Sequence, residues 1–362
     1  MNCYTIICRS GLGTVEITKT YSSYTNSTTL VDKLSLILKL SRPRTWVFAI
    51  LSFFYAYMRT SNPVMWQIFA GIAIFSLGTG ATNMINAYTD IPEDLVNNPI
   101  RIDFIRRLGM KNLINATISA YVFLILLSLP FGLTFTSIIL MAILVSAFYS
   151  LPPIRLKKHP ILALSGFSGA VALPFLAGLA AINQLSLADP WFIIFTVFML
   201  TYGTVKNIPD LAGDKLAGLR TTATSFKDFN KAIKVSTFLL LLPYLPLTLF
   251  IITGIFHQLY LLDIPLIAFP IYWAYKNFKT KNREALEKLH TYGFIYAVSF
   301  FLYNLMLSYP SIISASVALS TLFAIFFMSK LGIDSRIRLP FNSSNPKFKE
   351  GNYGSHRHRS SG

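Results

Sequence analysis

The stretch VMWQIFAGIAIFSLGTGATNMINA occupies residues 64–87 and runs directly into the acidic segment YTDIPED of residues 88–94. No charged residue interrupts the first segment, and about 20 apolar residues are enough for a helix to cross a bilayer. The stretch therefore predicts a membrane-spanning helix that ends in a group of carboxylates at one membrane surface.

The composition of the whole chain fits the same class of protein. Of its 362 residues, 53% are hydrophobic and only 13% are charged, whereas about 25% of the residues of a soluble domain are charged. We expect an all-α fold, a multi-pass transmembrane helical bundle of nine or ten spans within residues 41–329. The predicted spans are approximately 44–61, 64–87, 113–132, 135–150, 161–182, 190–205, 233–253, 259–275, 291–307 and 311–329.

The charged residues predict how the bundle is oriented. The formal net charge is +17, and the charges lie in short loops between apolar stretches, which indicates membrane topology and not nucleic-acid binding. Every lysine and arginine except Arg59 falls on or beside one side of the ten predicted spans. Because cytoplasmic loops are enriched in Lys and Arg, we expect that side, which includes both chain ends, to face the cytoplasm.

The two ends of the chain differ from the apolar middle. Residues 1–40 are expected to be a cytoplasmic N-terminal segment, polar and flexible at first, without the pattern of a signal peptide. Residues 29–41 form an amphipathic stretch, which predicts a helix that lies in the headgroup region or covers the end of the bundle. The basic tail at residues 330–362 is expected to be disordered and attracted to anionic lipid. The two cysteines, Cys3 and Cys8, have neither metal-site spacing nor a disulfide framework.

The first acidic group reads NAYTDIPED and begins at Asn86. Residues four apart project from the same face of a helix, so Asn86, Asp90 and Asp94 are expected to form one row. Pro92 should kink or end the helix within this row. Glu93 is therefore an alternative to Asp94 as a ligand.

The second acidic group reads KNIPDLAGD and begins at Lys206. Its Asp210 and Asp214 are again four residues apart, and Pro209 before them suits the first turn of a helix. Both acidic groups fall where a predicted span meets the cytoplasm. We expect them to face each other.

Carboxylates that converge in a pocket repel one another by about 1–4 kcal/mol per close pair, depending on the local dielectric constant. A hard divalent cation removes that repulsion, and Mg²⁺ characteristically takes one or two carboxylates together with phosphate oxygens. The two facing rows therefore suggest Mg²⁺ ions that bridge a diphosphate. Ordinary solvated helix caps are the alternative for either group taken alone. The candidate metal-binding and catalytic residues are Asp90, Asp94, Asp210 and Asp214.

Basic and aromatic residues accompany these groups in three cytoplasmic loops. Guanidinium and ammonium groups would stabilise the charge that grows on a departing diphosphate. Arg106, Arg107 and Lys158 are assigned to membrane topology instead. The candidate substrate-binding residues are Asn86, Arg101, Tyr149, Arg155, Lys157, Lys206 and Arg220.

Taken together, these residues resemble the UbiA superfamily of intramembrane prenyltransferases. The first motif of that family, Asn-x₃-Asp-x₃-Asp, appears in the segment that begins at Asn86, and the second, Asp-x₃-Asp, begins at Asp210. The resemblance extends from SRPRT at residues 41–45 through the eighth predicted span. Three segments are most similar in sequence to the homogentisate prenyltransferase branch: SRPRT, YSLPPIRLK at residues 149–157 and KNIPDLAGDK.

The chain departs from that branch at several positions. Relatives usually have other residues at the positions of Thr89, Pro92 and Glu93, and many have an aspartate at the position of Asn207. Members with a compact Tyr-x₃-Lys motif have a lysine where this chain has Pro153, so Arg155 or Lys157 would have to contact the diphosphate. These departures bear on the identity of the acceptor.

The resemblance implies an ionisation mechanism inside the membrane. Mg²⁺ and nearby cations would draw charge from a prenyl diphosphate, and the allylic cation would alkylate an electron-rich acceptor, of the aromatic quinone or tocopherol precursor type. The apolar bundle would hold the prenyl tail and exclude water. The implied partners are a prenyl diphosphate, a small aromatic or lipid acceptor and membrane lipid, with the active site toward the cytoplasm.

Three other functions are consistent with parts of the pattern. A UbiA-type terpene cyclase would cyclise its own prenyl chain, and a related transferase would use a lipid glycerol, a tetrapyrrole or a carotenoid as the acceptor. A transporter would use polar groups at the span ends as an ion path. The acidic residues collect at one membrane interface, and this argues against a transporter.

Overall fold

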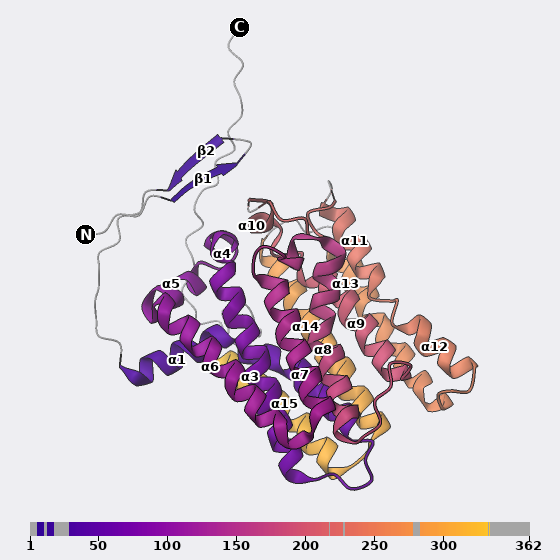
Figure 1. The fold of residues 1–362 in the computed structure, drawn as a ribbon. Helices are drawn as coiled ribbons and strands as arrows, with labels where there is room; N and C mark the ends of the chain where they lie inside the picture. Colours follow the sequence, from indigo (N-terminus) through magenta and orange to yellow (C-terminus); the bar gives the residue numbers. More distant parts are fainter. Residues whose placement is uncertain are drawn as a thin grey trace.

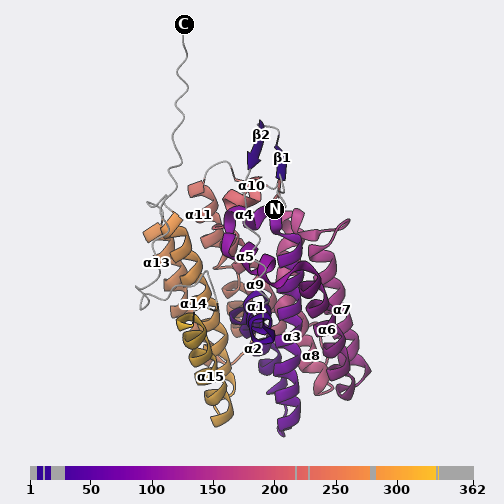
Figure 2. The same ribbon diagram turned by 90° about the vertical axis from the view of Figure 1, so that its left-hand side faces the viewer.

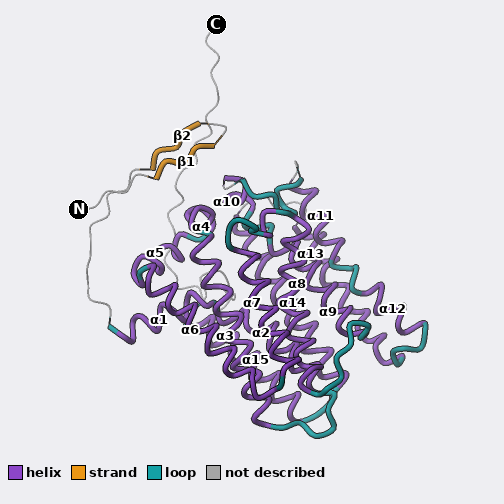
Figure 3. The backbone as a smooth tube through the Cα atoms, in the orientation of Figure 1, coloured by secondary structure: helices purple, strands orange, loops and turns teal. Residues whose placement is uncertain are grey.

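The computed structural model describes residues 6–10, 13–17, 29–216, 218–226, 229–277, 283–331 and 333. The predicted basic tail lies outside these residues from position 334 onward. The described part is a helical bundle, and helices dominate the backbone in Figure 3. A short antiparallel hairpin, which the sequence pattern did not predict, is formed by β1 (Ile6–Ser10) and β2 (Gly13–Ile17).

The described α-helices form one bundle, with the short helices α4 and α10 at the same end of it (Figures 1 and 2). They are α1 (Leu30–Ser41), α2 (Trp46–Tyr57), α3 (Met65–Thr89), α4 (Ile91–Asn97), α5 (Pro99–Leu108), α6 (Met110–Ser128), α7 (Leu133–Ser150), α8 (Pro160–Ala181), α9 (Pro190–Lys206), α10 (Leu211–Leu216), α11 (Phe229–Leu239), α12 (Tyr244–Ile252), α13 (Ala268–Asn277), α14 (Arg283–Ser308) and α15 (Ile312–Lys330). Four 3₁₀ segments join them: η1 (Pro43–Thr45), η2 (Leu129–Phe131), η3 (Leu156–Lys158) and η4 (Gln258–Ile267).

Seven helical segments in the described residues are long and apolar enough to cross a membrane. They are Met65–Thr89, Met110–Phe131, Leu133–Ser150, Pro160–Ala181, Lys231–Ile252, His290–Ser308 and Ile312–Lys330. The other predicted spans correspond to α2, α9 and the segment Gln258–Tyr272, which are helical but shorter. The fold class predicted from the sequence is thus confirmed.

The most buried helix is α2, because ten of its twelve residues are buried. Its rings pack in a dense aromatic core: Phe53 lies 5.0 Å from Phe75, and Tyr55 lies 4.8 Å from Phe195, between ring centroids. Aromatic pairs at such distances stabilise a core beyond the burial of their surface. Helix α2 therefore forms the axis against which α3, α8 and α14 pack.

An ion pair stands at the end of the bundle opposite the acidic groups. Arg59 and Asp189 form an ion pair there, with one N–O distance of 2.9 Å, and Asp189 also caps α9 by accepting from the Trp191 and Phe192 backbone N–H groups. The expected split of charge between the two ends is therefore visible in the fold.

Helix α1 begins with a capping box between Thr29 and Asp32. It packs on α3 and α5 through the buried Leu36 and Leu40, while Leu30 and Leu34 are exposed. An apolar surface left on an interfacial helix suits the headgroup region of a membrane. The domain boundary at residue 40 remains a prediction.

Close packing of α2 on α8 depends on Gly178. A Cβ atom at this position would lie 2.6 Å from the Phe53 carbonyl oxygen and 2.8 Å from the Ala56 Cβ. We predict that Gly178→Ala lowers the thermal unfolding temperature in detergent, since overpacking a core typically costs about 1–3 kcal/mol.

Gly169→Ala is the matched control on the same helix. Its added Cβ would meet nothing closer than 3.7 Å, and alanine is the better helix former. Equal unfolding temperatures for the two variants would contradict the close approach of α2 and α8.

Candidate active site

The two acidic groups lie at the same end of the bundle, where α4 and α10 are neighbours (Figures 1 and 2). They line one polar pocket of about 100 Å³. The side chains of the two sequence groups that line it are Asn86, Asp90, Glu93 and Asp94 from the first, and Lys206, Asn207, Asp210 and Asp214 from the second. The other polar side chains that line it are Arg42, Asn97, Asn98, Arg101, Tyr149, Lys157 and Thr221.

The helical backbone that carries the first acidic group bends just before Pro92. Helix α3 ends at Thr89, and α4 starts at Ile91 with Pro92 in its first turn. Asp90 stands at the junction, where its N–H donates to the Asn86 carbonyl and its own carbonyl accepts from the Asp94 N–H. The backbone hydrogen bonds continue through the bend, so Asp90 at the junction and Asp94 within α4 reach the same pocket.

Asn97 joins the two acidic groups. Its Nδ2 donates to the Asp210 carbonyl at 3.0 Å, and its Oδ1 accepts from the Gly213 N–H at 2.9 Å. A Cβ on Gly213 would lie 2.4–2.6 Å from the Asn97 amide atoms. A glycine is therefore required at position 213 for α10 to approach α4 this closely.

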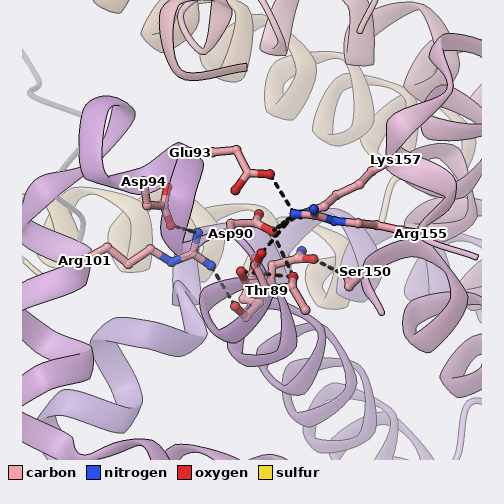
Figure 4. Close-up of polar contacts among 10 residues, drawn as sticks. Thr89, Asp90, Glu93, Asp94, Arg101, Ser150, Arg155 and Lys157 are labelled. Atoms are coloured by element: carbon pink, nitrogen blue, oxygen red, sulfur yellow. Dashed lines mark hydrogen bonds and ion pairs between the residues drawn. The ribbon is translucent and has the colours of Figure 1, made fainter. Parts of the chain in front are cut away.

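Arg101 connects the pocket to the start of the bundle (Figure 4). Its Nη1 donates to Asp94 at 2.7 Å and its Nη2 to the Asn83 carbonyl at 2.8 Å. The Asn83 side chain in turn donates to the Thr45 hydroxyl at 2.8 Å and to the Ser41 carbonyl at 2.9 Å. The orientation of Asp94 thus depends on the SRPRT segment, which lies far away in the sequence.

The loop between α7 and α8 supplies two cations. Arg155 donates to Glu93 at 2.7 Å and to the Thr89 carbonyl at 2.9 Å, and its Nη2 lies 4.0 Å from Asp90 (Figure 4). The Lys157 ammonium contacts Asp90 directly. Both residues that the sequence proposed in place of a compact lysine motif therefore face the acidic groups.

Burial shapes the charge of the pocket. It raises the pKa of Asp214 to about 7, and the charge of Asp210 adds to that shift. Burial also raises the pKa of Glu93 and lowers the pKa of Lys157 to about 7, against the opposing effect of Asp214. Carboxylates and an ammonium in this pocket hold their charges only with partners of opposite sign.

The remaining predicted residues differ in their position. Lys206 lines the pocket, and its ammonium also lies 4.8 Å from the centroid of the Phe167 ring. Tyr149 is another wall residue, and Asn86 accepts a hydrogen bond from the Ser150 hydroxyl. Arg220 is exposed, and only its neighbours Leu219 and Thr221 line the pocket. The structure therefore does not bring Arg220 to the other candidate residues.

Two charged wall residues were absent from the list of predicted site residues: Arg42, and Glu93, which was considered only as an alternative to Asp94. Arg42 belongs to SRPRT, one of the segments on which the family resemblance rests. Glu93 is 4% exposed and its Oε2 has no hydrogen-bond partner. The pocket thus contains a fifth carboxylate beside the four predicted aspartates.

An apolar chamber of about 190 Å³ adjoins the polar pocket. Arg42, Asn86, Tyr149 and Lys206 line both spaces and form their common boundary. Most of the chamber wall is apolar, with side chains of α2, α3, α6, α7, α8, α9 and α14. A molecule with a charged head and a hydrocarbon tail would fill the two spaces together.

The pocket fits Mg²⁺ only if another molecule completes the coordination. No three His, Cys, Asp or Glu side chains among the described residues are close enough to hold a metal ion on their own. The available donors are hard oxygens, and the buried, unpartnered Glu93 oxygen adds one more. Since Mg²⁺ commonly uses one or two carboxylates with phosphate oxygens and water, this donor set fits an ion shared with a phosphorylated ligand.

The profile of the UbiA prenyltransferase family matches residues 45–305. The hop (Humulus lupulus) 2-acylphloroglucinol 4-prenyltransferase is 30% identical over 194 residues, 51% of this chain and 47% of that protein. The probable homogentisate phytyltransferase 2 of rice (Oryza sativa subsp. japonica) is 28% identical over 172 residues, 44% of this chain and 45% of that protein. The chain thus spans about half the length of these curated relatives.

Other comparisons extend over more of the chain. The lycopene elongase/hydratase of Corynebacterium glutamicum is 26% identical over 221 residues, 59% of this chain and 76% of that protein. The structure of a UbiA homolog from Archaeoglobus fulgidus bound to GPP and Mg²⁺ superposes with a TM-score of 0.57 at 17% identity, over 75% of this chain and 99% of that one. This likeness shows a common fold.

The hydrogen bonds of Asn97 make its side chain a test of how the two acidic groups are held together. We predict that Asn97→Ala weakens Mg²⁺ binding about tenfold, because two hydrogen bonds worth about 0.5–1.5 kcal/mol each are lost. The measurement is the Mg²⁺-dependent rise of the unfolding temperature in detergent.

Asn112→Ala serves as the control. Asn112 makes one hydrogen bond, to the Leu108 carbonyl at the start of α6, and it does not line the pocket. A Mg²⁺ response of Asn97→Ala equal to that of this control would show that the contact between α4 and α10 does not position the carboxylates.

Proposed function

Because this chain belongs to the UbiA prenyltransferase family, an integral membrane family, we propose that it uses Mg²⁺ to transfer the prenyl group of a prenyl diphosphate to an aromatic acceptor. One observation carries the proposal: the carboxylate-lined pocket and the apolar chamber share a boundary. This arrangement suits a diphosphate on the polar side and its hydrocarbon chain on the other. The similarity to phloroglucinol and homogentisate prenyltransferases supports an aromatic acceptor.

In this proposal Asp90, Asp94, Asp210 and Asp214 hold the metal. When bound, Mg²⁺ neutralises the charge that the leaving diphosphate develops. Three cations of the chain bind the leaving diphosphate as well. These are Arg42 and Lys206, which line both spaces, and Lys157, which lines the polar pocket.

The cations also have a role before substrate arrives. Lys157 contacts Asp90 and Arg101 pairs with Asp94, which offsets the repulsion among the carboxylates. A diphosphate gives Lys157 a stronger anionic partner and so frees Asp90 for the metal. Arg101 is held by the Asn83 carbonyl as well and keeps the orientation of Asp94.

The chamber serves the carbon part of the reaction. Its described wall includes the rings of Phe48, Phe167, Tyr202 and Phe294, and Phe167 lies against the boundary residue Lys206. Aromatic faces attract a cation, so they stabilise the allylic carbocation that forms when the C–O bond breaks. The apolar wall excludes water that would otherwise quench this cation.

The orientation of the site is part of the proposal. The acidic pocket lies at the end of the bundle opposite Arg59, and the predicted spans put every other lysine and arginine of the sequence on or beside the side of the acidic groups. This distribution supports a cytoplasmic position.

The four aspartates provide the direct test of the reaction. We predict that Asp90→Ala and Asp210→Ala each reduce prenyl transfer at least 100-fold in liposomes, with normal membrane insertion and an unchanged unfolding temperature without metal. Chelation of Mg²⁺ should abolish the activity of the wild-type protein. The product is measured by mass spectrometry with several prenyl diphosphates and with homogentisate and an acylphloroglucinol as acceptors.

Asp103→Ala is the control for the loss of one carboxylate. Asp103 pairs with Arg106 on α5 and does not line the pocket. Near wild-type transfer by either pocket variant would overturn the metal assignment. Products formed from the prenyl diphosphate without an acceptor would identify a terpene cyclase instead.

The cytoplasmic orientation is tested by single cysteines in a background that lacks Cys3 and Cys8. We predict that Arg107→Cys, on α5, reacts with a membrane-impermeant maleimide only from the cytoplasmic side, and that Ser61→Cys, before α3, reacts only from the opposite side. Both positions are exposed. The reverse labelling pattern would place the active site on the other membrane face.

A further inference from the structure

The loop between α7 and α8 brings two cations to the first acidic group, and their surroundings differ. Lys157 lines the polar pocket, whereas Arg155 lines neither the pocket nor the chamber. The Arg155 Nη2 donates instead to Glu93 Oε1 at 2.7 Å and to the Thr89 carbonyl at 2.9 Å (Figure 4). A cation in this position connects the loop to the end of α3 and to α4, and its charge is directed at the chain itself.

Burial makes the contact between Arg155 and Glu93 a strong one. The two side chains are 17% and 5% exposed, and a charge-assisted hydrogen bond in such surroundings is screened less than one at the surface. The ion pair of Arg106 with Asp103 has the same N–O distance of 2.7 Å, but its side chains are 55% and 44% exposed. Exposed pairs contribute little to stability, so this second pair is a matched control for the first.

The backbone of the loop also depends on Arg155. This residue has φ 41° and ψ 63°, in the left-handed region that is unfavourable for residues other than glycine. Such a conformation persists where the surrounding contacts hold it. The segment η3 starts directly after Arg155, and Lys157 is its second residue; the Lys158 N–H donates to the Arg155 carbonyl at 3.0 Å. The direction of η3, and with it the position of Lys157, therefore follows from the conformation of Arg155.

The loop thus reaches the first acidic group through two separate contacts. Lys157 contacts Asp90, and Arg155 contacts Glu93. In the proposed reaction a diphosphate takes over Lys157 and frees Asp90 for the metal. The contact between Arg155 and Glu93 lies outside this exchange, because Arg155 lines neither space. It keeps η3 beside the pocket while Lys157 changes its partner.

We propose that Arg155 and Glu93 form a latch that positions Lys157 for the diphosphate. This inference rests on the proposed function and deepens it by separating the roles of the two loop cations. Arg155 is a positioning residue and acts through Lys157. The cation that contacts the diphosphate from this loop is then Lys157, a choice that the sequence left open between the two residues.

Hydrogen–deuterium exchange tests the latch in the absence of substrate and Mg²⁺. The full-length wild-type protein, Arg155→Gln and Glu93→Ala are compared in liposomes, and the peptides that cover residues 154–159 are followed by mass spectrometry. We expect the amides of this loop to exchange about tenfold faster in each variant, because the charged hydrogen bond that restrains the loop is lost. Arg106→Gln should leave the exchange of the loop unchanged.

Exchange in α2, the buried helix of the bundle, is the internal reference and should be equal in all four proteins. Wild-type exchange of residues 154–159 in both Arg155→Gln and Glu93→Ala would contradict the latch. The two substitutions lie in different elements, so each checks the result of the other.

Binding of a non-reactive prenyl thiolodiphosphate in Mg²⁺ separates positioning from direct contact. We expect Lys157→Gln and Arg155→Gln each to weaken this binding about tenfold, since each removes the action of the same ammonium group. The double variant should bind within about twofold of Lys157→Gln, because residues that act as one unit are not additive. Losses that multiply in the double variant would make Arg155 a ligand in its own right and overturn the proposal.

The two measurements keep the latch and the proposed function apart. Faster loop exchange in Arg155→Gln together with wild-type thiolodiphosphate binding would show that the contact restrains the loop without positioning Lys157, which also overturns the proposal. A wild-type protein that does not bind the thiolodiphosphate in Mg²⁺ would overturn the proposed function, whatever the exchange of the loop.

Discussion

Repulsion among buried carboxylates is the constraint on which the rest of this structure depends. Asp90, Glu93, Asp94, Asp210 and Asp214 line one small pocket, and two like charges 4 Å apart cost about 4 kcal/mol at an effective dielectric constant of 20. Ion pairs with Arg101, Arg155 and Lys157 offset part of this repulsion. Burial nevertheless raises the pKa values of Asp214 and Glu93. A pocket of this kind is stabilised by cations, and bound Mg²⁺ would supply further positive charge.

Because the carboxylates repel one another, hydrogen bonds and close packing around the pocket hold them in place. Asn97 spans the gap between the two acidic groups, and Gly213 permits its close approach. Arg101 and Asn83 extend the hydrogen bonds to Thr45 at the start of α2. Because α2 is the buried axis of the bundle, the positions of the carboxylates depend on the packing of the whole membrane domain.

The separation of a polar pocket from an apolar chamber gives each part of a prenyl diphosphate a suitable environment. The four shared boundary residues lie where the C–O bond of the substrate would break. In the proposed reaction, cations on the polar side would stabilise the charge of the leaving diphosphate, and aromatic rings of the chamber would stabilise the carbocation. Arg44 and His290 also line the chamber, beside its mostly apolar wall.

Much of this could be read from the sequence, because its strongest signals are local. A helix needs about 20 apolar residues to cross a bilayer, so the spans and the charge asymmetry appear directly in the composition of successive segments. Spacing of four residues and the order of the motifs singled out Asp90, Asp94, Asp210 and Asp214. Only the tertiary structure decided which cations reach them: Arg155 and Lys157 do, whereas Arg220 is exposed. It also decided that Arg44 and His290, which are 246 residues apart, line one chamber. Contacts between distant helices depend on how the helices pack, and no pattern within a single helix encodes that.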